Sequence, residues 1–304
     1  MDEDHLRRRI VEQFSYRGDR ADIWRGFDRF LETESFLNLG YSRWYQSHLL
    51  GSPQRRLALR VGRTLREHLN GDGTDRTSDG IDRILDVGCG RGGPAIQLAD
   101  RLGVAVVGID LVPHNVSRAA ENAAATVEDG DSIGAEFVLG DATRLPFAPG
   151  TMSGCTAIDA LVYVPERDRV LSELATVTDP GGIIVITDPV GTPGLSDAER
   201  RRLDAFADAW DMPPLWTRTR YRQAIEDAGF EVLAVEDLTP GSVGRFRKWT
   251  ALFGIVRSSP ADRPLRWLFR RWELDPDTIT TQIQHAHRAL PSLRHVLFTA
   301  RRPH

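Results

Sequence analysis

The chain has 304 residues, 41% of them hydrophobic and 27% charged, which predicts a folded core in one large domain, with or without an appended subdomain. Its net charge of −4 lacks the basic excess of nucleic-acid-binding proteins, so we expect no nucleic-acid partner. No apolar run is long enough to predict a membrane span. The acidic N-terminus, and the location of Cys89 and Cys155 in or beside expected core elements, favour a cytoplasmic protein without a disulfide framework.

Residues 1–80 are expected to form a helical region that ends in a linker. The segment 53–69 carries apolar residues at the spacing of one helix face, namely Leu57, Val61, Leu65 and Leu69. The polar, glycine-rich segment 70–80 has the composition of a linker.

From residue 81 onward, short apolar segments alternate with segments of helical periodicity. We expect strands near residues 82–87, 104–109, 135–139, 153–158, 182–187, 230–238 and 295–300. We expect helices near residues 93–102, 114–127, 166–177, 197–210 and 218–228. Such alternation is typical of parallel βαβ units, so it predicts an α/β fold with helices on both faces of one sheet.

The segment 240–292 lies between the last two expected strands and is unusually long for a connection. It is rich in aromatic and arginine residues, and we expect it to be helical. The chain is therefore divided into an N-terminal helical lid and linker (1–80), an α/β core (81–239), this helical insertion (240–292) and a last core strand (293–304).

The clearest motif is a glycine-rich turn between the first expected strand and the next helix, Ile84-Leu85-Asp86-Val87-Gly88-Cys89-Gly90-Arg91-Gly92-Gly93. Glycines let the backbone approach a ligand closely, and the free amides of the helix then face that ligand. The turn alone is weak evidence, because dinucleotide-binding enzymes use a similar one. Asp86 decides between cofactors, since its carboxylate would repel a pyrophosphate but attract the methionine ammonium of S-adenosylmethionine (SAM).

Two further acids end the next two expected strands. Asp110 lies about twenty residues after the glycine turn, the spacing at which an acid meets a ribose in nucleotide-binding folds. Asp141 follows the third strand, where a carboxylate can accept a hydrogen bond from an adenine amino group. Each acid alone could be an ordinary helix cap. Three acids at successive strand ends, together with the glycine turn, predict a nucleotide crevice at one edge of the sheet.

These motifs resemble the core of class I SAM-dependent methyltransferases, over residues 81–190 and the two later strands. The similar group includes ubiquinone and menaquinone C-methyltransferases, sterol methyltransferases and rebeccamycin-type sugar O-methyltransferases. The resemblance implies a Rossmann-like sheet of seven mostly parallel strands with an antiparallel last strand, an N-terminal helical lid and a helical insertion before the last strand. The segment Asn38-Leu39-Gly40-Tyr41 resembles the lid motif of this group.

The resemblance implies SAM as the cofactor and S-adenosylhomocysteine (SAH) as its product. An aromatic lid residue covers the cofactor in this group, a role expected for Tyr41 and also for Tyr16. The expected cofactor-binding residues are Tyr16, Tyr41, Asp86, Gly88, Cys89, Gly90, Asp110, Leu111, Asp141, Ala142 and Ile158. No metal site is expected, because the close pair His285 and His287 would lie on different faces of a helix.

The catalytic candidates follow the fourth and fifth expected strands. Several O-methyltransferases that the chain resembles carry two histidines at the positions of Val162 and Tyr163, which this chain lacks. Tyr163 could bind a substrate or be an aromatic residue at the core rim, and its ordinary pKa near about 10 makes it a poor base. Asp159 matches an acid common in the group, with a structural cap as the alternative.

Asp188 corresponds to a catalytic candidate of the sugar O-methyltransferases. We expect Asp188 to act as the base or to orient the substrate, with a strand-end turn before proline as the structural alternative.

The insertion admits three interpretations. Its segments 245–249 and 263–272 combine tryptophan and phenylalanine with arginine. They could form an apolar substrate lid with a cationic rim, a membrane contact through 245–272, or a helical cap with an aromatic core and solvated arginines. In the family that the chain resembles, insertions at this place can lie over the substrate, which favours a substrate cap over a membrane contact.

The sequence thus predicts a SAM-dependent methyltransferase acting on an oxygen or carbon of a small, fairly apolar metabolite, as a monomer or homodimer. The alternatives are a SAM-binding regulatory protein without turnover, an N-methyltransferase of a small amine, and an NAD-dependent dehydrogenase, against which Asp86 argues. The methyl acceptor stays open.

Overall fold

The computed structural model describes residues 3–15, 32–46, 52–69, 83–126 and 134–304. Tyr16, an expected lid residue, and the expected linker lie outside these ranges, so both stay predictions. Among the described residues, no helix combines the length and the hydropathy needed to cross a bilayer.

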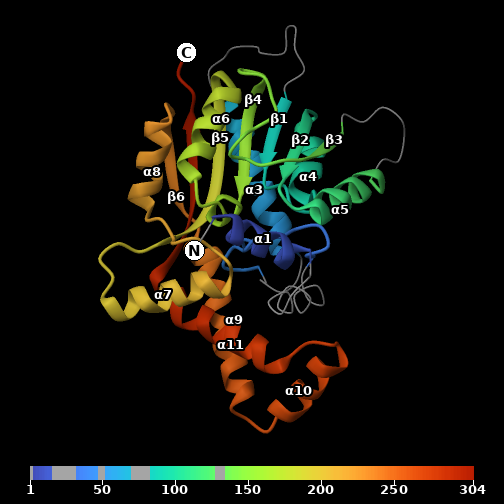
Figure 1. The fold of residues 1–304 in the computed structure, drawn as a ribbon, viewed down its shortest axis with the longest axis vertical. Coiled ribbons are helices and arrows are strands. Elements are labelled where there is room, and N and C mark those ends of the chain that lie inside the picture. The colour runs from blue at the N-terminus through green and yellow to red at the C-terminus, as the bar shows by residue number, and fades with distance from the viewer. Residues whose placement is uncertain (1–2, 16–31, 47–51, 70–82, 127–133) are drawn as a thin grey trace.

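A seven-stranded sheet forms the centre of the molecule (Figure 1). Its strands are β1 Arg83–Val87, β2 Ala105–Asp110, β3 Ala135–Leu139, β4 Met152–Ile158, β5 Thr178–Gly191, β6 Glu231–Asp237 and β7 Leu293–Arg301. The helices of the core and N-terminal region are α1 Glu3–Phe14, α3 Pro53–Leu69, α4 Gly93–Leu102, α5 Pro113–Ala124, α6 Arg167–Val177, α7 Asp197–Ala209 and α8 Arg218–Asp227. The insertion contains α9 Val243–Arg257, α10 Asp262–Arg271 and α11 Pro276–Ala289, and short 3-10 turns are η2 Leu161–Tyr163, η3 Thr239–Gly241 and η4 Leu290–Ser292.

The strand order is β3-β2-β1-β4-β5-β7-β6. The pairs among β1 to β5 are parallel, whereas β7 runs antiparallel to both β5 and β6. This topology confirms the predicted Rossmann-like fold. Because parallel strands end at the same edge, the residues after β1, β2, β3 and β4 meet there, which is where such folds bind ligands.

Apolar side chains cover both faces of the sheet. On one face, Leu57 of α3 and Leu98 of α4 are buried against the strands, and on the other face Leu171 of α6 and Ile225 of α8 are buried. Every residue of β4 is buried, as expected for a central parallel strand covered on both faces. The sheet edge is therefore held rigidly between two helical layers.

Two helical segments, α1 and the start of α9, lie at the carboxyl edge of the sheet (Figure 1). Helix α1 packs there through Leu6, Ile10 and Phe14, in a cluster that includes Val112 and Val162. Because β6 is parallel to β5, α9 begins at the same edge. Figure 1 shows α9 and α10 projecting from it as an arm, defined here as residues 243–272, while α11 leads back toward β7.

Gly88 begins the turn after β1 with a φ of +66°, a conformation that favours glycine. A Cβ atom at Gly88 would lie 2.4 Å from the Cβ atom of Ala160, which follows β4. The turn therefore requires glycine twice over, for its backbone conformation and for the close approach of the neighbouring loop.

We expect Gly88→Ala to lower the free energy of unfolding more than Gly103→Ala does. Gly103 has nearly the same φ, +67°, but no atom lies within 4 Å of its Cβ position. The backbone conformation should cost about 1–2 kcal/mol in either variant, and overpacking should cost Gly88→Ala about 1–3 kcal/mol more. Chemical denaturation measures both losses. Equal losses would show that the contact with Ala160 does not constrain the turn.

Candidate cofactor and methyl-transfer site

A cavity of about 1040 Å³, part of it open to solvent, lies at the carboxyl edge of the sheet. Its wall combines the ends of β1, β2 and β4 with the loop after β3 and with α1. It brings together nine of the expected cofactor-binding residues, namely Asp86, Gly88, Cys89, Gly90, Asp110, Leu111, Asp141, Ala142 and Ile158.

Asp86 carries a buried carboxylate that only one side-chain partner satisfies. Its Oδ1 accepts a hydrogen bond from Thr156 Oγ1 at 2.7 Å, and its Oδ2 has no hydrogen-bond partner among the described residues. Burial raises the pKa of Asp86 to about 7, against the effect of Thr156. A buried, unpaired carboxylate oxygen is costly alone and is satisfied by a cationic group, so this site fits an ammonium.

Asp110 is held in place by three donors. Its Oδ2 accepts the Gly90 amide at 2.9 Å, and its Oδ1 accepts the Val112 amide at 2.9 Å and Asn115 Nδ2 at 3.2 Å. Burial raises the pKa of Asp110 to about 6, although all three hydrogen bonds lower it. The carboxylate is thereby fixed at the end of β2, facing the cavity.

Asn115 is a cavity residue that the sequence analysis missed. Its Oδ1 is buried and accepts no hydrogen bond from the described residues, while its Nδ2 contacts Asp110. Its position five residues after Asp110, in the first turn of α5, is the signal that could have identified it. Asn115 adds a neutral acceptor beside the carboxylate.

Asp141 forms an ion pair with Arg7, a residue that no sequence motif indicated. Its Oδ2 lies 2.6 Å from Arg7 Nη1, and Arg7 Nη2 lies 3.1 Å from Glu166 Oε1. Burial raises the pKa of Asp141, but hydrogen bonds from Thr143 and the charge of Arg7 outweigh it, so the pKa is lowered. An adenine at this place would share Asp141 with Arg7, which ties α1 across the cavity.

Tyr41 does not occupy the position expected for a lid residue. It is absent from the cavity wall, and its ring lies under the Arg60 guanidinium at 5.0 Å, against α3. The reason is a turn at Gly40, where φ is +73° and the Gly40 amide donates to Asn38 Oδ1 at 3.0 Å. Leu37 and Asn38 line the cavity in its place.

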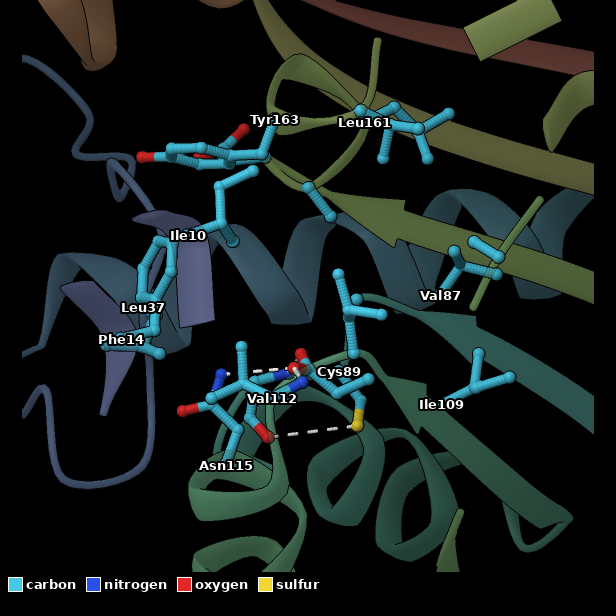
Figure 2. A pocket seen from close by; sticks show the side chains of 18 of the residues that line it. Ile10, Phe14, Leu37, Val87, Cys89, Ile109, Val112, Asn115, Leu161 and Tyr163 are labelled. Atoms are coloured by element: carbon cyan, nitrogen blue, oxygen red, sulfur yellow. Dashed lines mark hydrogen bonds between the residues drawn. The ribbon is translucent and has the colours of Figure 1, made fainter. Parts of the chain in front are cut away.

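One end of the cavity is apolar. Figure 2 shows Ile10, Phe14, Leu37 and Tyr163 grouped on one side, apart from Cys89 and Asn115. The rings of Phe14 and Tyr163 meet edge to face with centroids 5.1 Å apart. Burial, followed by the charges of Asp159 and Asp188, raises the pKa of Tyr163. Its hydroxyl therefore stays protonated and can donate a hydrogen bond, but cannot serve as a base.

Asp159 lines the cavity and is fixed from three directions. Its Oδ1 accepts Thr187 Oγ1 at 2.9 Å and lies 2.7 Å from His295 Nε2, while its Oδ2 accepts the Leu39 amide at 2.8 Å. Its backbone adopts a positive φ of +54°, a strained conformation for aspartate that is typical of functional loops.

The sequence analysis did not identify His295, because its contact with Asp159 depends on the register of β7 against β5. The pairing of β7 with β5 places it opposite Pro189, where it is fully buried between Asp159 and Ser242. The sequence shows only a histidine at the start of an apolar strand. Through His295, the cavity loop is joined to the segment that begins the arm.

Asp188, the expected base, lies behind the cavity wall. Its side chain is fully buried, it is not among the lining residues, and its Oδ2 accepts Tyr221 Oη at 2.6 Å. Burial raises the pKa of Asp188 to about 7. A base must come within hydrogen-bond reach of its substrate. This placement differs from the expected direct catalytic role, and it differs from the strand-end turn as well, because Asp188 lies within β5 and pairs with β7.

The insertion contributes no residue to the cavity wall among the residues that the structure describes. Part of its aromatic content instead forms a core of its own, where Phe269 is buried against Phe253 and Trp272. The cavity is covered by α1 and the segment 37–38 rather than by residues 240–292.

Comparison with known proteins places this geometry in a family. Residues 85–186 match the model of the family described as "Methyltransferase domain". The 27-O-demethylrifamycin SV methyltransferase of Amycolatopsis mediterranei is 30% identical over 73% of this chain and 78% of its own length. Methyltransferase GfsG of Streptomyces halstedii is 31% identical over 52% of this chain, and the match spans only about half of GfsG, 55%.

The fold also matches a solved structure over nearly its whole length. Geranyl diphosphate C-methyltransferase of Streptomyces coelicolor A3(2), in complex with Mg²⁺, geranyl diphosphate and SAH, covers 98% of this chain and 97% of its own, with a TM-score of 0.66 and 15% identity. The rifamycin methyltransferase match, together with the family model, shows that the chain belongs to the SAM-dependent methyltransferases, a family whose cofactor is SAM.

We expect SAH to bind roughly tenfold more weakly at pH 6 than at pH 8. With a pKa of about 7, the Asp86 carboxyl is mostly ionised at pH 8 and mostly protonated at pH 6, and only the ionised form attracts the ammonium. Isothermal titration calorimetry measures both affinities.

The matched variant is Asp86→Asn, which keeps the size of the side chain but cannot ionise. It should bind SAH weakly and lose most of the pH dependence, with a smaller part remaining from Asp110, whose pKa is about 6. A wild-type affinity that stays constant or rises toward pH 6 would contradict the assignment of Asp86.

Proposed function

We propose that the protein transfers the methyl group of SAM to an oxygen or carbon of a small, fairly apolar molecule. The observation that carries this proposal is that one cavity combines the carboxylates of Asp86, Asp110 and Asp141 with a separate apolar group, Ile10, Phe14 and Leu37. The first suits the cofactor and the second suits an acceptor with few charges. Relatives named as O-methyltransferases and sterol C-methyltransferases support the same reaction class.

Three acids would hold the cofactor. Asp86 would receive the methionine ammonium on its unpaired oxygen, Asp110 the ribose hydroxyls, and Asp141 with the Ala142 amide the adenine. When bound, SAM would supply an electrophilic methyl group on its sulfonium for a nucleophile of the acceptor. The protein contributes mainly orientation and the exclusion of water.

The residues at the apolar end would orient the acceptor. Tyr163 can donate a hydrogen bond to an acceptor oxygen, and Ile10, Phe14 and Leu37 would exclude water around it. Asp159 would keep the loop after β4 in place beneath the acceptor through its bonds to Leu39 and His295. Asp188 would act from behind this loop, as a positioning residue.

The direct test is SAH formation with a panel of small molecules that differ in nucleophile and polarity. We expect turnover with apolar phenols or activated carbons, which can lose their acidic proton to solvent before the transfer, and none with simple amines. Asp110→Ala should weaken SAH binding at least about tenfold, because a buried carboxylate bonded to two ribose hydroxyls is lost. Asp100→Ala, on the exposed side of α4, is the control. Turnover restricted to amines, or unchanged SAH binding by Asp110→Ala, would contradict the proposal.

Tyr163→Phe and Asp188→Asn distinguish an acceptor contact from a positioning residue. Tyr163→Phe removes one hydrogen bond, and we expect kcat to fall roughly threefold to tenfold with unchanged SAH affinity. Asp188→Asn should lower the thermal midpoint and leave the pH profile of kcat unchanged, since Asp188 does not reach the cavity. Loss of the acidic limb from that pH profile, where the rate falls as a base becomes protonated, would instead restore Asp188 as the base.

A further inference from the structure

The arm is strongly basic on an otherwise acidic protein. Its thirty residues contain a single acid, Asp262, in a chain whose net charge is −4. Its basic residues are Arg245, Arg247, Lys248, Arg257, Arg263, Arg266, Arg270 and Arg271. Figure 1 shows α10 at the end of the arm farthest from the sheet, so this charge is displaced away from the core.

Helix α10 has two distinct faces. Its inner face is covered, because Leu265 and Phe269 pack against Phe253 of α9. Its outer face presents exposed residues at the spacing of neighbouring helical turns, namely Arg263, Trp267, Arg270 and Arg271. Trp267 is 65% exposed although it is the largest side chain of the helix. The outer face therefore is not needed to hold the arm together.

The positive charge of this face is not neutralised within the described part of the chain. Asp262 pairs with Arg257, and Asp277 pairs with Arg266 at 2.7 Å. No ion pair within the described residues involves the three arginines of the outer face. Helix α9 adds exposed apolar side chains on the same arm, with Leu252 46% and Ile255 67% exposed, close to Trp249 and Lys248 in the helix.

We propose that the arm docks the protein peripherally on an anionic lipid bilayer. The arginines of α10 would contact lipid phosphates, and Trp267 and the exposed residues of α9 would enter the headgroup region. Tryptophan prefers this interface because its ring is apolar and its N–H is polar. Charge alone would also suit an acidic protein or a nucleic acid, but exposed Trp267, Leu252 and Ile255 favour a surface with an apolar layer beneath the charge.

The position of the arm connects this docking with the cavity. Both the arm and α1 lie at the carboxyl edge of the sheet (Figure 1). Docking through the arm would bring that edge toward the bilayer, where apolar acceptors accumulate. This connection rests on the proposed function, but docking itself does not, because vesicle binding is measured without cofactor or acceptor.

Flotation with vesicles tests the proposal on the full chain. We expect binding to vesicles of phosphatidylcholine with 30% phosphatidylglycerol at low salt, little binding to pure phosphatidylcholine, and release at 0.5 M salt. Each charge near the surface contributes about fivefold in affinity, so Arg263→Gln/Arg270→Gln/Arg271→Gln should weaken binding roughly 100-fold. Trp267→Ala should weaken it at least about threefold.

The matched control replaces three exposed arginines of α3 and α4, Arg63→Gln/Arg66→Gln/Arg101→Gln, with the same change in net charge. It should bind the anionic vesicles as the wild type does. No binding by the wild type, or equal losses in the two triple variants, would overturn the proposal. So would displacement from vesicles by a nucleic acid or acidic peptide with no effect of Trp267→Ala, which would show a general polyanion surface. Unchanged SAH affinity in the arm variants shows that they fold.

Discussion

The hydrogen bond from the Gly90 amide to Asp110 Oδ2, 2.9 Å long, joins the glycine turn to the end of the neighbouring strand. It forms because β1 and β2 are adjacent, parallel and in a register that pairs Val87 with Ile109. On its other side the turn packs against the loop after β4, because Gly88 leaves room for Ala160. This constraint fixes the Asp110 carboxylate, which in turn holds Asn115 at the cofactor end of the cavity.

The sheet and the cofactor end of the cavity were accessible from the sequence, because both depend on local patterns. Strand–helix alternation predicted the fold, and acids at three strand ends predicted residues that the structure brings into one cavity wall. The glycines alone would have been ambiguous, since Gly88, Gly90 and Gly93 also have the spacing of dinucleotide-binding turns. The carboxylate of Asp86 distinguishes a SAM site from a dinucleotide site, and the match to the methyltransferase family agrees with this distinction.

Contacts between distant segments, at either end of the cavity, could not be predicted in the same way. Arg7 reaches Asp141 across 134 positions, and His295 reaches Asp159 across 136. The expected position of Asp188 at a strand end did not show whether its side chain reaches the cavity. The side chain points into the core instead, where it accepts a hydrogen bond from Tyr221. Tyr41 was misplaced for a similar reason, because the turn at Gly40 directs it toward α3.

The central claim is that one cavity holds SAM through acids at successive strand ends, with the acceptor at the opposite, apolar end. A crystal structure of the complex with SAH tests it most directly. The account predicts the ammonium on Asp86, the ribose hydroxyls on Asp110, the adenine beside Asp141, and the sulfur directed toward Tyr163. A nucleoside bound outside this cavity, or bound with its adenine among Ile10, Phe14 and Tyr163, would contradict it.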